Sequence, residues 1–210
     1  VPEDLPAGAS VTYALSRGSG GSTETEDGVA VAPLPEEIAI RVDGDPFTRY
    51  RVEPELPRAG MDTLYRRAGY LHPVRSPSGT LVTDDYPPDH AHHHGLWAAW
   101  TNTEYRGETP DFWNTPEGTG TVRVEAIDSS WSGPVAGGLR AIHRYVDRTG
   151  ERPATVLRER WTTRVFRVRG GTEGTPYRLF DIDLHQVNVT DDPLVLPPYH
   201  YGGFAVRGHR

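Results

Sequence analysis

The sequence predicts an all-β protein folded as an antiparallel β-sandwich. Several segments alternate apolar and polar residues with a period of two, which is typical of strands with one buried and one wet face. Glycine (23 residues) and proline (19 residues) are abundant, which suits many turns between short strands. No segment longer than about two helical turns shows a 3.6-residue period. A length of 210 residues fits one domain, so we expect residues 1–210 to form a single sandwich.

The individual elements follow from local pattern. Residues 1–57 are expected to form an edge hairpin region of the same domain, with residues 17–27 as a polar loop or hairpin tip. Residues 96–101 fit either a short helix or a strand. Clear alternation of apolar residues with Arg, Glu and Thr predicts strands at residues 37–42, 121–126, 139–146, 155–168 and 177–189.

Composition excludes several kinds of chemistry. The chain has no cysteine, which excludes disulfides, zinc fingers, iron–sulfur clusters and a thiol nucleophile. It also has no lysine, so all 22 basic residues are arginine. Schiff-base chemistry therefore cannot occur, which removes pyridoxal phosphate as a cofactor. A nucleotide-binding P-loop also needs its lysine, and the glycines near residue 20 do not form a dinucleotide fingerprint.

Charge and hydropathy restrict the partners. A net charge of −7 without an arginine-rich run disfavours a nucleic-acid partner. No apolar run of about 18 residues is present, so membrane insertion is not expected. The compartment, secreted, periplasmic or cytoplasmic, and the oligomeric state are left open by the sequence.

A histidine cluster is the most informative stretch of the chain. Four of the nine histidines, His90, His92, His93 and His94, lie within five positions. On a strand, His-x-His spacing places two imidazoles on one face, roughly 7 Å apart at their Cα atoms, which suits two ligands of one metal ion. We therefore predict His90 and His92 as ligands of a divalent metal ion. The alternative is a histidine-rich turn. Candidates for a third ligand are Asp89, Glu104, Asp111, His72 and His200.

Two further tracts carry functional side chains. Residues 111–114 read Asp-Phe-Trp-Asn, and an indole flanked by polar groups is a common way to hold a sugar. The alternative is a core tryptophan with Asp111 and Asn114 capping a turn. Residues 199–208 contain Tyr199, His200 and Arg207 beside paired glycines, which predicts acid–base groups and an anion clamp, or otherwise a glycine-bulged strand. His143 and His185 alternate along strands and are interpreted as packing or surface residues.

Together these tracts resemble a bacterial family of unknown function labelled "methane oxygenase PmoA". The matching residues are 69–73 (GYLHP), 89–97 (DHAHHHGLW), 111–113 (DFW) and 201–207 (YGGFAVR). The resemblance covers residues 69–210. It implies a link to sugar metabolism, because members occur beside carbohydrate-degrading enzymes. It also implies a domain that continues beyond Arg210, and His94 departs from the arginine common in the family.

The predicted function is that of a carbohydrate-active enzyme: a lyase, epimerase or hydrolase acting on a sugar or uronic acid. By fold analogy the sandwich would be of the sugar-epimerase (galactose mutarotase-like) supersandwich type. His93 and His200 would exchange protons and Asp111 would orient one of them. The alternatives are a non-catalytic carbohydrate-binding module and a metal-dependent oxygenase, which needs two histidines and a carboxylate around iron. The predicted substrate-binding residues are His72, His94, Trp97, Trp113, Asn114, Tyr199 and Arg207.

Overall fold

The computed structural model describes residues 7–10, 27–56, 58–168 and 176–210, and the description below concerns those residues. They form ten strands and two single-turn 3₁₀ helices. In chain order these are β1 (Val29–Pro33), β2 (Glu37–Val42), β3 (Asp45–Arg51), η1 (Thr63–Tyr65), β4 (Leu71–Val74), β5 (Leu96–Ala99), η2 (Thr115–Glu117), β6 (Gly120–Trp131), β7 (Ala136–Asp147), β8 (Ala154–Phe166), β9 (Leu179–Asn188) and β10 (Gly203–Val206).

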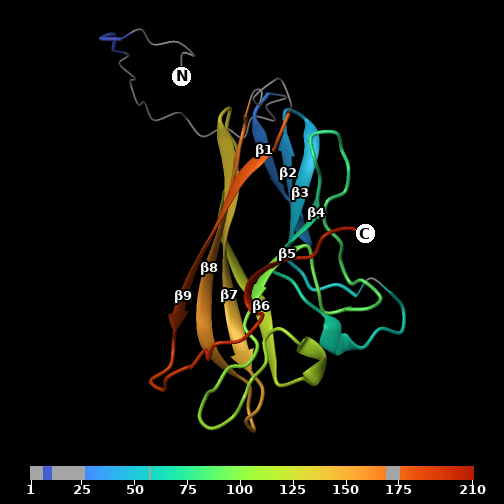
Figure 1. Ribbon diagram of the computed structural model, residues 1–210, viewed down its shortest axis with the longest axis vertical. Helices are drawn as coiled ribbons and strands as arrows, with labels where there is room; N and C mark the ends of the chain where they lie inside the picture. Colours follow the sequence, from blue (N-terminus) through green and yellow to red (C-terminus); the bar gives the residue numbers. More distant parts are fainter. Residues whose placement is uncertain (1–6, 11–26, 57, 169–175) are drawn as a thin grey trace.

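The strands form two antiparallel sheets that face each other (Figure 1). One sheet has six strands in the order β1-β2-β3-β4-β5-β10, and the other has four in the order β6-β7-β8-β9. This arrangement confirms the prediction of an all-β, antiparallel, sandwich-like fold. The supersandwich subtype, and a single domain that continues beyond Arg210, stay predictions.

Period-two alternation explains which face of each strand is buried. On β8, Leu157, Trp161 and Val165 are buried and point to the other sheet, whereas Arg158 and Arg160 are exposed. A strand that presents apolar side chains on one face and guanidinium groups on the other can lie only with its apolar face inward. The same rule sets β2, where Ile38, Ile40 and Val42 are buried.

The core consists of two clusters of buried side chains between the sheets. One cluster surrounds Trp161 and joins β1, β2, β3, β7 and β8. The other surrounds Trp97 and Phe112 and includes Tyr145 of β7. Burial of this apolar surface, roughly 25 cal/mol per Å², is the main force that holds the sheets together.

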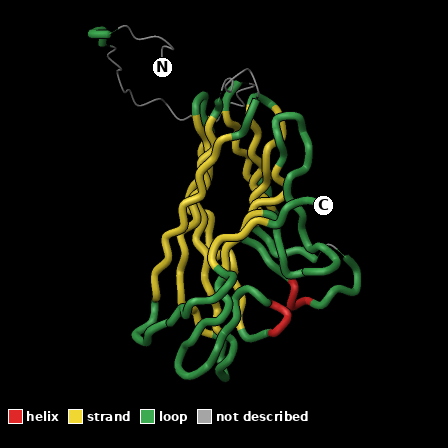
Figure 2. The backbone as a smooth tube through the Cα atoms, in the orientation of Figure 1, coloured by secondary structure: helices red, strands yellow, loops and turns green. Residues whose placement is uncertain are grey.

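The predicted strands agree with the observed ones, with shifted ends. Residues 121–126 extend to β6 and residues 139–146 to β7, because these strands pair along most of their length as a hairpin. Residues 96–101 contain the strand β5, which pairs with β4 and β10. Strands and loops make up almost all of the described backbone, and helix is confined to two short turns (Figure 2). Most of the predicted loop at residues 17–27 lies outside the described residues. Among the described residues, no helix is long and apolar enough to cross a membrane.

Candidate functional site

The histidine cluster is a turn that leads into β5. The backbone N–H of His93 donates to the carbonyl of His90 at 2.8 Å, so residues 90–93 fold back on themselves. The rings of His90 and His93 stack with centroids 4.8 Å apart, and the ring of His92 meets that of His93 edge-on at 4.6 Å. Three imidazoles are therefore gathered by a tight turn, and not by the alternation of a strand that His-x-His spacing would use.

His94 is separated from the other three because it points into the protein. Its side chain is fully buried, and its ring stacks on Tyr70 with centroids 4.5 Å apart. Nδ1 of His94 lies 2.7 Å from Oδ1 of Asp85, whose other oxygen accepts the hydroxyl of Tyr70 at 2.9 Å. Burial lowers the pKa of His94 to about 4, and the bond to Asp85 offsets this in part. The neutral ring therefore donates from Nδ1 and anchors the turn, where no substrate can reach it without a rearrangement.

Trp97 and Trp113 form the floor of the cluster. Their ring centroids lie 4.7 Å apart, and the ring of His93 lies 5.3 Å from Trp97 and 6.0 Å from Trp113. Their exposed fractions are 1% and 6%. Because the indole faces are covered by protein, they support the imidazoles and leave almost no surface on which a sugar ring could stack.

Both carboxylate oxygens of Asp111 accept hydrogen bonds within and beside the turn that carries Trp113. Its Oδ1 accepts the backbone N–H groups of Trp113 and Asn114, each at 2.8 Å. Its Oδ2 accepts the hydroxyl of Thr101 and the side-chain amide of Asn114, each at 2.7 Å. Its charge acts on His92 and raises the pKa of that ring, against the larger lowering by burial. The structure gives Asp111 no hydrogen bond to either predicted proton-transfer histidine.

The C-terminal aromatic residues reach the histidine cluster through Trp113. The ring of Tyr201 lies 5.5 Å from that of Trp113, and the ring of His200 lies 4.7 Å from that of Tyr201. Tyr199 packs on His200 at 4.2 Å. Tyr199 and Tyr201 are 49% and 38% exposed, so these rings meet solvent. We call the connected set of rings the imidazole–aromatic cluster: His90, His92, His93, Trp97, Trp113, Tyr199, His200 and Tyr201.

The paired glycines beside this tract have a packing role. Gly203 has a φ of +80°, in the left-handed region that favours glycine. A Cβ on Gly203 would lie 3.3 Å from the ring of Trp100. The glycine therefore lets β10 approach the Trp100 side chain closely while it pairs with β5.

Arg207 pairs with Asp89 beside the histidine turn, whereas His72 lies on β4 next to Gly95. A guanidinium nitrogen of Arg207 lies 3.1 Å from Oδ1 of Asp89, and Arg210 also pairs with this carboxylate. The bond from His90, followed by these two arginines, holds the pKa of Asp89 well below its usual range. His72, on β4, bonds to the hydroxyl of Thr83 at 3.0 Å. Its pKa is lowered, mainly by burial.

No group of three His, Asp or Glu side chains is arranged to hold a metal ion within the part of the chain that the structure describes. The rings of His90 and His92 lie 6.1 Å apart. Nδ1 of His90 bonds to Asp89 at 2.9 Å, as ligand imidazoles bond through the nitrogen that does not bind the metal. The divalent metal stays a prediction.

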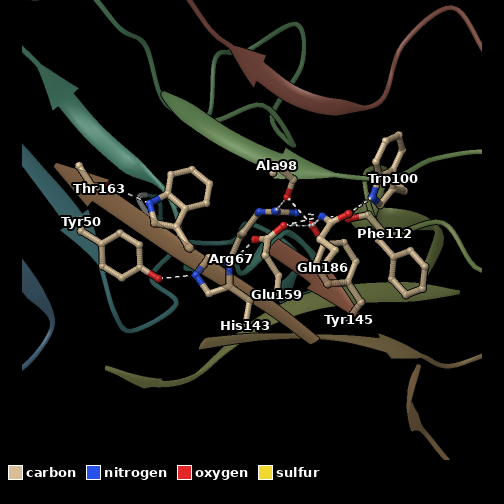
Figure 3. A network of polar contacts seen from close by, with 11 residues as sticks. Tyr50, Arg67, Ala98, Trp100, Phe112, His143, Tyr145, Glu159, Thr163 and Gln186 are labelled. Carbon is tan, nitrogen blue, oxygen red and sulfur yellow. Dashed lines mark hydrogen bonds and ion pairs between the residues drawn. The ribbon is translucent and has the colours of Figure 1, made fainter. Parts of the chain in front are cut away.

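A second polar constellation lies in the core and was not predicted (Figure 3). Nδ1 of His143 lies 2.8 Å from Oε1 of Glu159, and Nε2 of His143 contacts the hydroxyl of Tyr50. Oε2 of Glu159 accepts the hydroxyl of Tyr145 at 3.0 Å and the amide of Gln186 at 2.5 Å. The chain of bonds therefore crosses from the six-stranded sheet into the four-stranded sheet.

The charge of Glu159 is stabilised although the carboxylate is completely buried. Burial raises its pKa, but bonds from His143, Gln186 and Tyr145 outweigh this, and the net pKa is lowered. The nearby guanidinium of Arg67 is also buried, and it donates to the carbonyls of Ala98 at 2.6 Å and Phe112 at 3.2 Å. Burial lowers the pKa of Arg67, and the field of Glu159 acts in the opposite direction.

Alternation alone could have located this network. His143 follows Ala141 and precedes Tyr145 at two-residue spacing on an otherwise apolar face, and Glu159 stands in the same way between Leu157 and Trp161. A titratable residue in phase with buried neighbours must point into the core. The interpretation of His143 as a packing or surface residue includes its buried position, but it does not include the hydrogen bonds that its ring forms.

The fold and these two sites define a class of protein: an antiparallel β-sandwich with a buried Tyr–His–Glu network and a solvent-facing cluster of imidazoles and phenols. The chain belongs to a family described as "Family of unknown function (DUF6807)", which matches residues 37–210. The match begins upstream of the predicted start at residue 69. It gives no support to the methane-oxygenase label and says nothing about residues beyond Arg210. No curated protein and no solved structure matches the chain at a significant level.

Proposed function

We propose that this protein binds a small carbohydrate at the imidazole–aromatic cluster and acts on it by proton transfer. The observation that supports this is the meeting of two segments about a hundred residues apart. The turn with His90, His92 and His93 and the tract with Tyr199 and His200 are joined through Trp113 and Tyr201. Scattered acid–base groups that meet in space are typical of an active site.

The exposed phenols make a carbohydrate the best-supported class of ligand. Tyr199 and Tyr201 present aromatic faces, on which the C–H groups of a sugar can pack, and hydroxyls that can bond to sugar hydroxyls. The two buried tryptophans hold the imidazoles in place beneath. In this arrangement the ring-binding role predicted for Trp97 and Trp113 passes to the tyrosines.

The reaction class follows from the side chains that face solvent. His93 and His200 are the imidazoles that two distant segments bring to the cluster, where Trp113 and Tyr201 lie between them. Imidazole is the commonest side chain in general acid–base catalysis. Burial, followed by the charges of His92 and His90, lowers the pKa of His93 to about 4, so its ring is neutral at pH 7 and can accept a proton. We assign His93 and His200 to the two proton transfers of an epimerase or lyase acting on a uronic acid, in which the carbon beside the carboxylate loses its proton.

Hydrogen–deuterium exchange tests this proposal directly. A panel of neutral sugars and uronic acids would be incubated with the protein in D₂O and followed by proton NMR. A substrate should lose the signal of its exchanging C–H, and His93→Gln or His200→Gln should lower the exchange rate by about 100-fold or more. His185→Gln is the matched control, because His185 is exposed on β9 and its residue partner across the sheet is the exposed Arg160.

The alternatives give different results in the same experiment. Binding to the cluster, seen as line broadening of sugar signals, without any exchange or product would identify a carbohydrate-binding module. The absence of both binding and exchange for every sugar tested would overturn the proposal.

A further inference from the structure

A cavity of about 420 Å³ lies beside β6, an edge strand of the four-stranded sheet. None of the residues that line it belongs to the histidine turn. Its walls come from the end of β3, from the η1 turn and from β6 and β7, and it shares no residue with the imidazole–aromatic cluster. In Figure 1 the η1 and η2 turns lie together next to the lower part of β6. Four arginines line this cavity: Arg66, Arg123, Arg144 and Arg148.

These four arginines are gathered around one cavity, and none forms an ion pair or a side-chain hydrogen bond among the described residues. Several other arginines of the described chain pair with carboxylates, as Arg158 does with Glu125 at 2.7 Å. Acidic partners are not scarce, since the protein has 29 Asp and Glu residues against 22 arginines. The wall of this cavity therefore carries four positive charges against one carboxylate, Glu53, in a protein that is acidic as a whole.

The strand register brings two of these charges into direct opposition. Arg123 of β6 and Arg144 of β7 are cross-strand partners, and like charges directly opposite each other destabilise a sheet. Burial, followed by the charge of Arg123, lowers the pKa of Arg148. A bound anion would offset this repulsion, so anion binding would stabilise this part of the sheet.

The remaining walls indicate what kind of molecule carries the anion. Val52, Leu64 and Val122 provide an apolar surface, and the single carboxylate in the wall, Glu53, can accept hydrogen bonds from hydroxyl groups. A ligand with negative charges over its whole length would be repelled by the carboxylate of Glu53. The volume lies within the range of roughly 300–1,000 Å³ typical of small-molecule sites.

We propose that this cavity binds a small hydroxylated molecule through one phosphate or sulfate ester group. Guanidinium groups present planar pairs of N–H donors that match the oxygens of a tetrahedral oxyanion. The arginines would hold the ester group, and the apolar wall with Glu53 would hold the rest of the molecule. This site is independent of the carbohydrate reaction proposed for the imidazole–aromatic cluster.

Calorimetry and thermal unfolding of the whole chain at constant ionic strength test the proposal. The probes are inorganic phosphate, inorganic sulfate, a hexose 6-phosphate, a hexose sulfate and the unmodified hexose. We expect saturable binding of both inorganic anions, tighter binding of at least one ester, and a rise in Tm of about 5–10 °C at roughly 100 times Kd. Which ester binds more tightly distinguishes a phosphorylated from a sulfated ligand.

Variants distinguish specific anion binding in this cavity from a general effect of salt on the charges of the protein. The double variant R123Q/R148Q should weaken binding by about tenfold or more. Without anions it should unfold at the same temperature as the wild type or higher, because a repulsion has been removed. The matched control is R160Q on the same sheet, since Arg160 is exposed and lines no wall of this cavity; it should bind within about twofold of the wild type.

Three results would overturn the proposal. The first is a Tm response to phosphate and sulfate no larger than to chloride. The second is an equal loss of binding in R160Q and in the double variant. The third is binding of the inorganic anions without tighter binding of either ester, which would leave no place for the hydroxylated part of the ligand.

Discussion

His143 and Glu159 are directly opposed cross-strand partners on β7 and β8, and their side chains bond at 2.8 Å in the centre of the sandwich. Both are completely buried, with exposed fractions of 1% and 0%. The consistent hydrogen-bond assignment has Nδ1–H of His143 donating to Glu159, and Nε2 accepting the hydroxyl of Tyr50. The hydroxyl of Tyr50 on β3 connects this pair of the four-stranded sheet to the six-stranded sheet by a polar contact.

Glu159→Gln should destabilise the protein strongly at neutral pH. The substitution removes the negative charge that faces the buried Arg67 and replaces an acceptor of three bonds by an amide. Removing one member of a buried charged pair typically costs about 3–5 kcal/mol. Urea unfolding of both proteins at pH 7 measures this, and a loss below about 1 kcal/mol would contradict the role given to Glu159.

The pH dependence of the same pair of proteins gives a second prediction. The pKa of Glu159 is lowered in the folded state, so the folded state binds its proton less readily than the unfolded state does. This stabilisation is fully present above the ordinary carboxyl pKa and is lost as pH falls through the lower folded-state value. The difference in unfolding free energy between wild type and Glu159→Gln should therefore shrink below about pH 4.5. A difference that stays constant down to pH 3.5 would show that the charge is not what matters.

Tyr50→Phe tests the link between the sheets. It removes only the hydroxyl that meets Nε2 of His143 and leaves that nitrogen without a partner. A buried acceptor left unpaired costs about 1–3 kcal/mol. The matched control is Tyr177→Phe, because the Tyr177 side chain is 46% exposed; thermal unfolding should show a change only for the Tyr50 variant.

Gly95→Ala should destabilise the turn that holds the histidines. A Cβ at this position would lie 2.2 Å from the carbonyl oxygen of Leu71 and 3.0 Å from the Cβ of His72. The backbone of β4 would have to move, at a cost of about 2 kcal/mol or more. Gly150→Ala is the control, since its nearest neighbour would be 3.9 Å away. Equal unfolding temperatures for the two variants would show that β4 and the turn adapt freely.

The metal prediction is tested by the metal content of the purified protein. If His90 and His92 bind a divalent ion, wild type should take up metal and His92→Ala should lose it, with an unchanged far-ultraviolet spectrum because the turn lies outside the core. Bond lengths of about 2.0–2.1 Å from imidazole nitrogen to a zinc ion are expected. Wild type that purifies without metal and cannot be loaded would leave these imidazoles as acid–base or sugar-binding groups. His185→Ala is the control for nonspecific binding by a surface histidine.

The sequence was sufficient for the class of fold and for the general location of the cluster. Alternation predicted β2, β6, β7, β8 and β9, because a strand with one buried face has an apolar residue at every second position. It was not sufficient for the side-chain roles. His94, Trp97 and Trp113 look like ligand-binding residues in the sequence, but tertiary packing buries them and leaves the solvent-facing roles to their neighbours.

By itself, the sequence determined the chemistry that the chain lacks and the faces of its strands. The absence of lysine and cysteine excludes whole classes of reaction, and period two places His143 and Glu159 inward. Only the tertiary structure decided which residues meet. The pairing of β10 with β5 brings Arg207 to Gly95 at the end of the histidine turn, and the register of β7 on β8 sets His143 opposite Glu159. Strands pair through backbone N–H and C=O groups, which almost every residue carries. Which strands pair, and in which register, is therefore decided by the packing of the whole core and cannot be derived from the local sequence pattern.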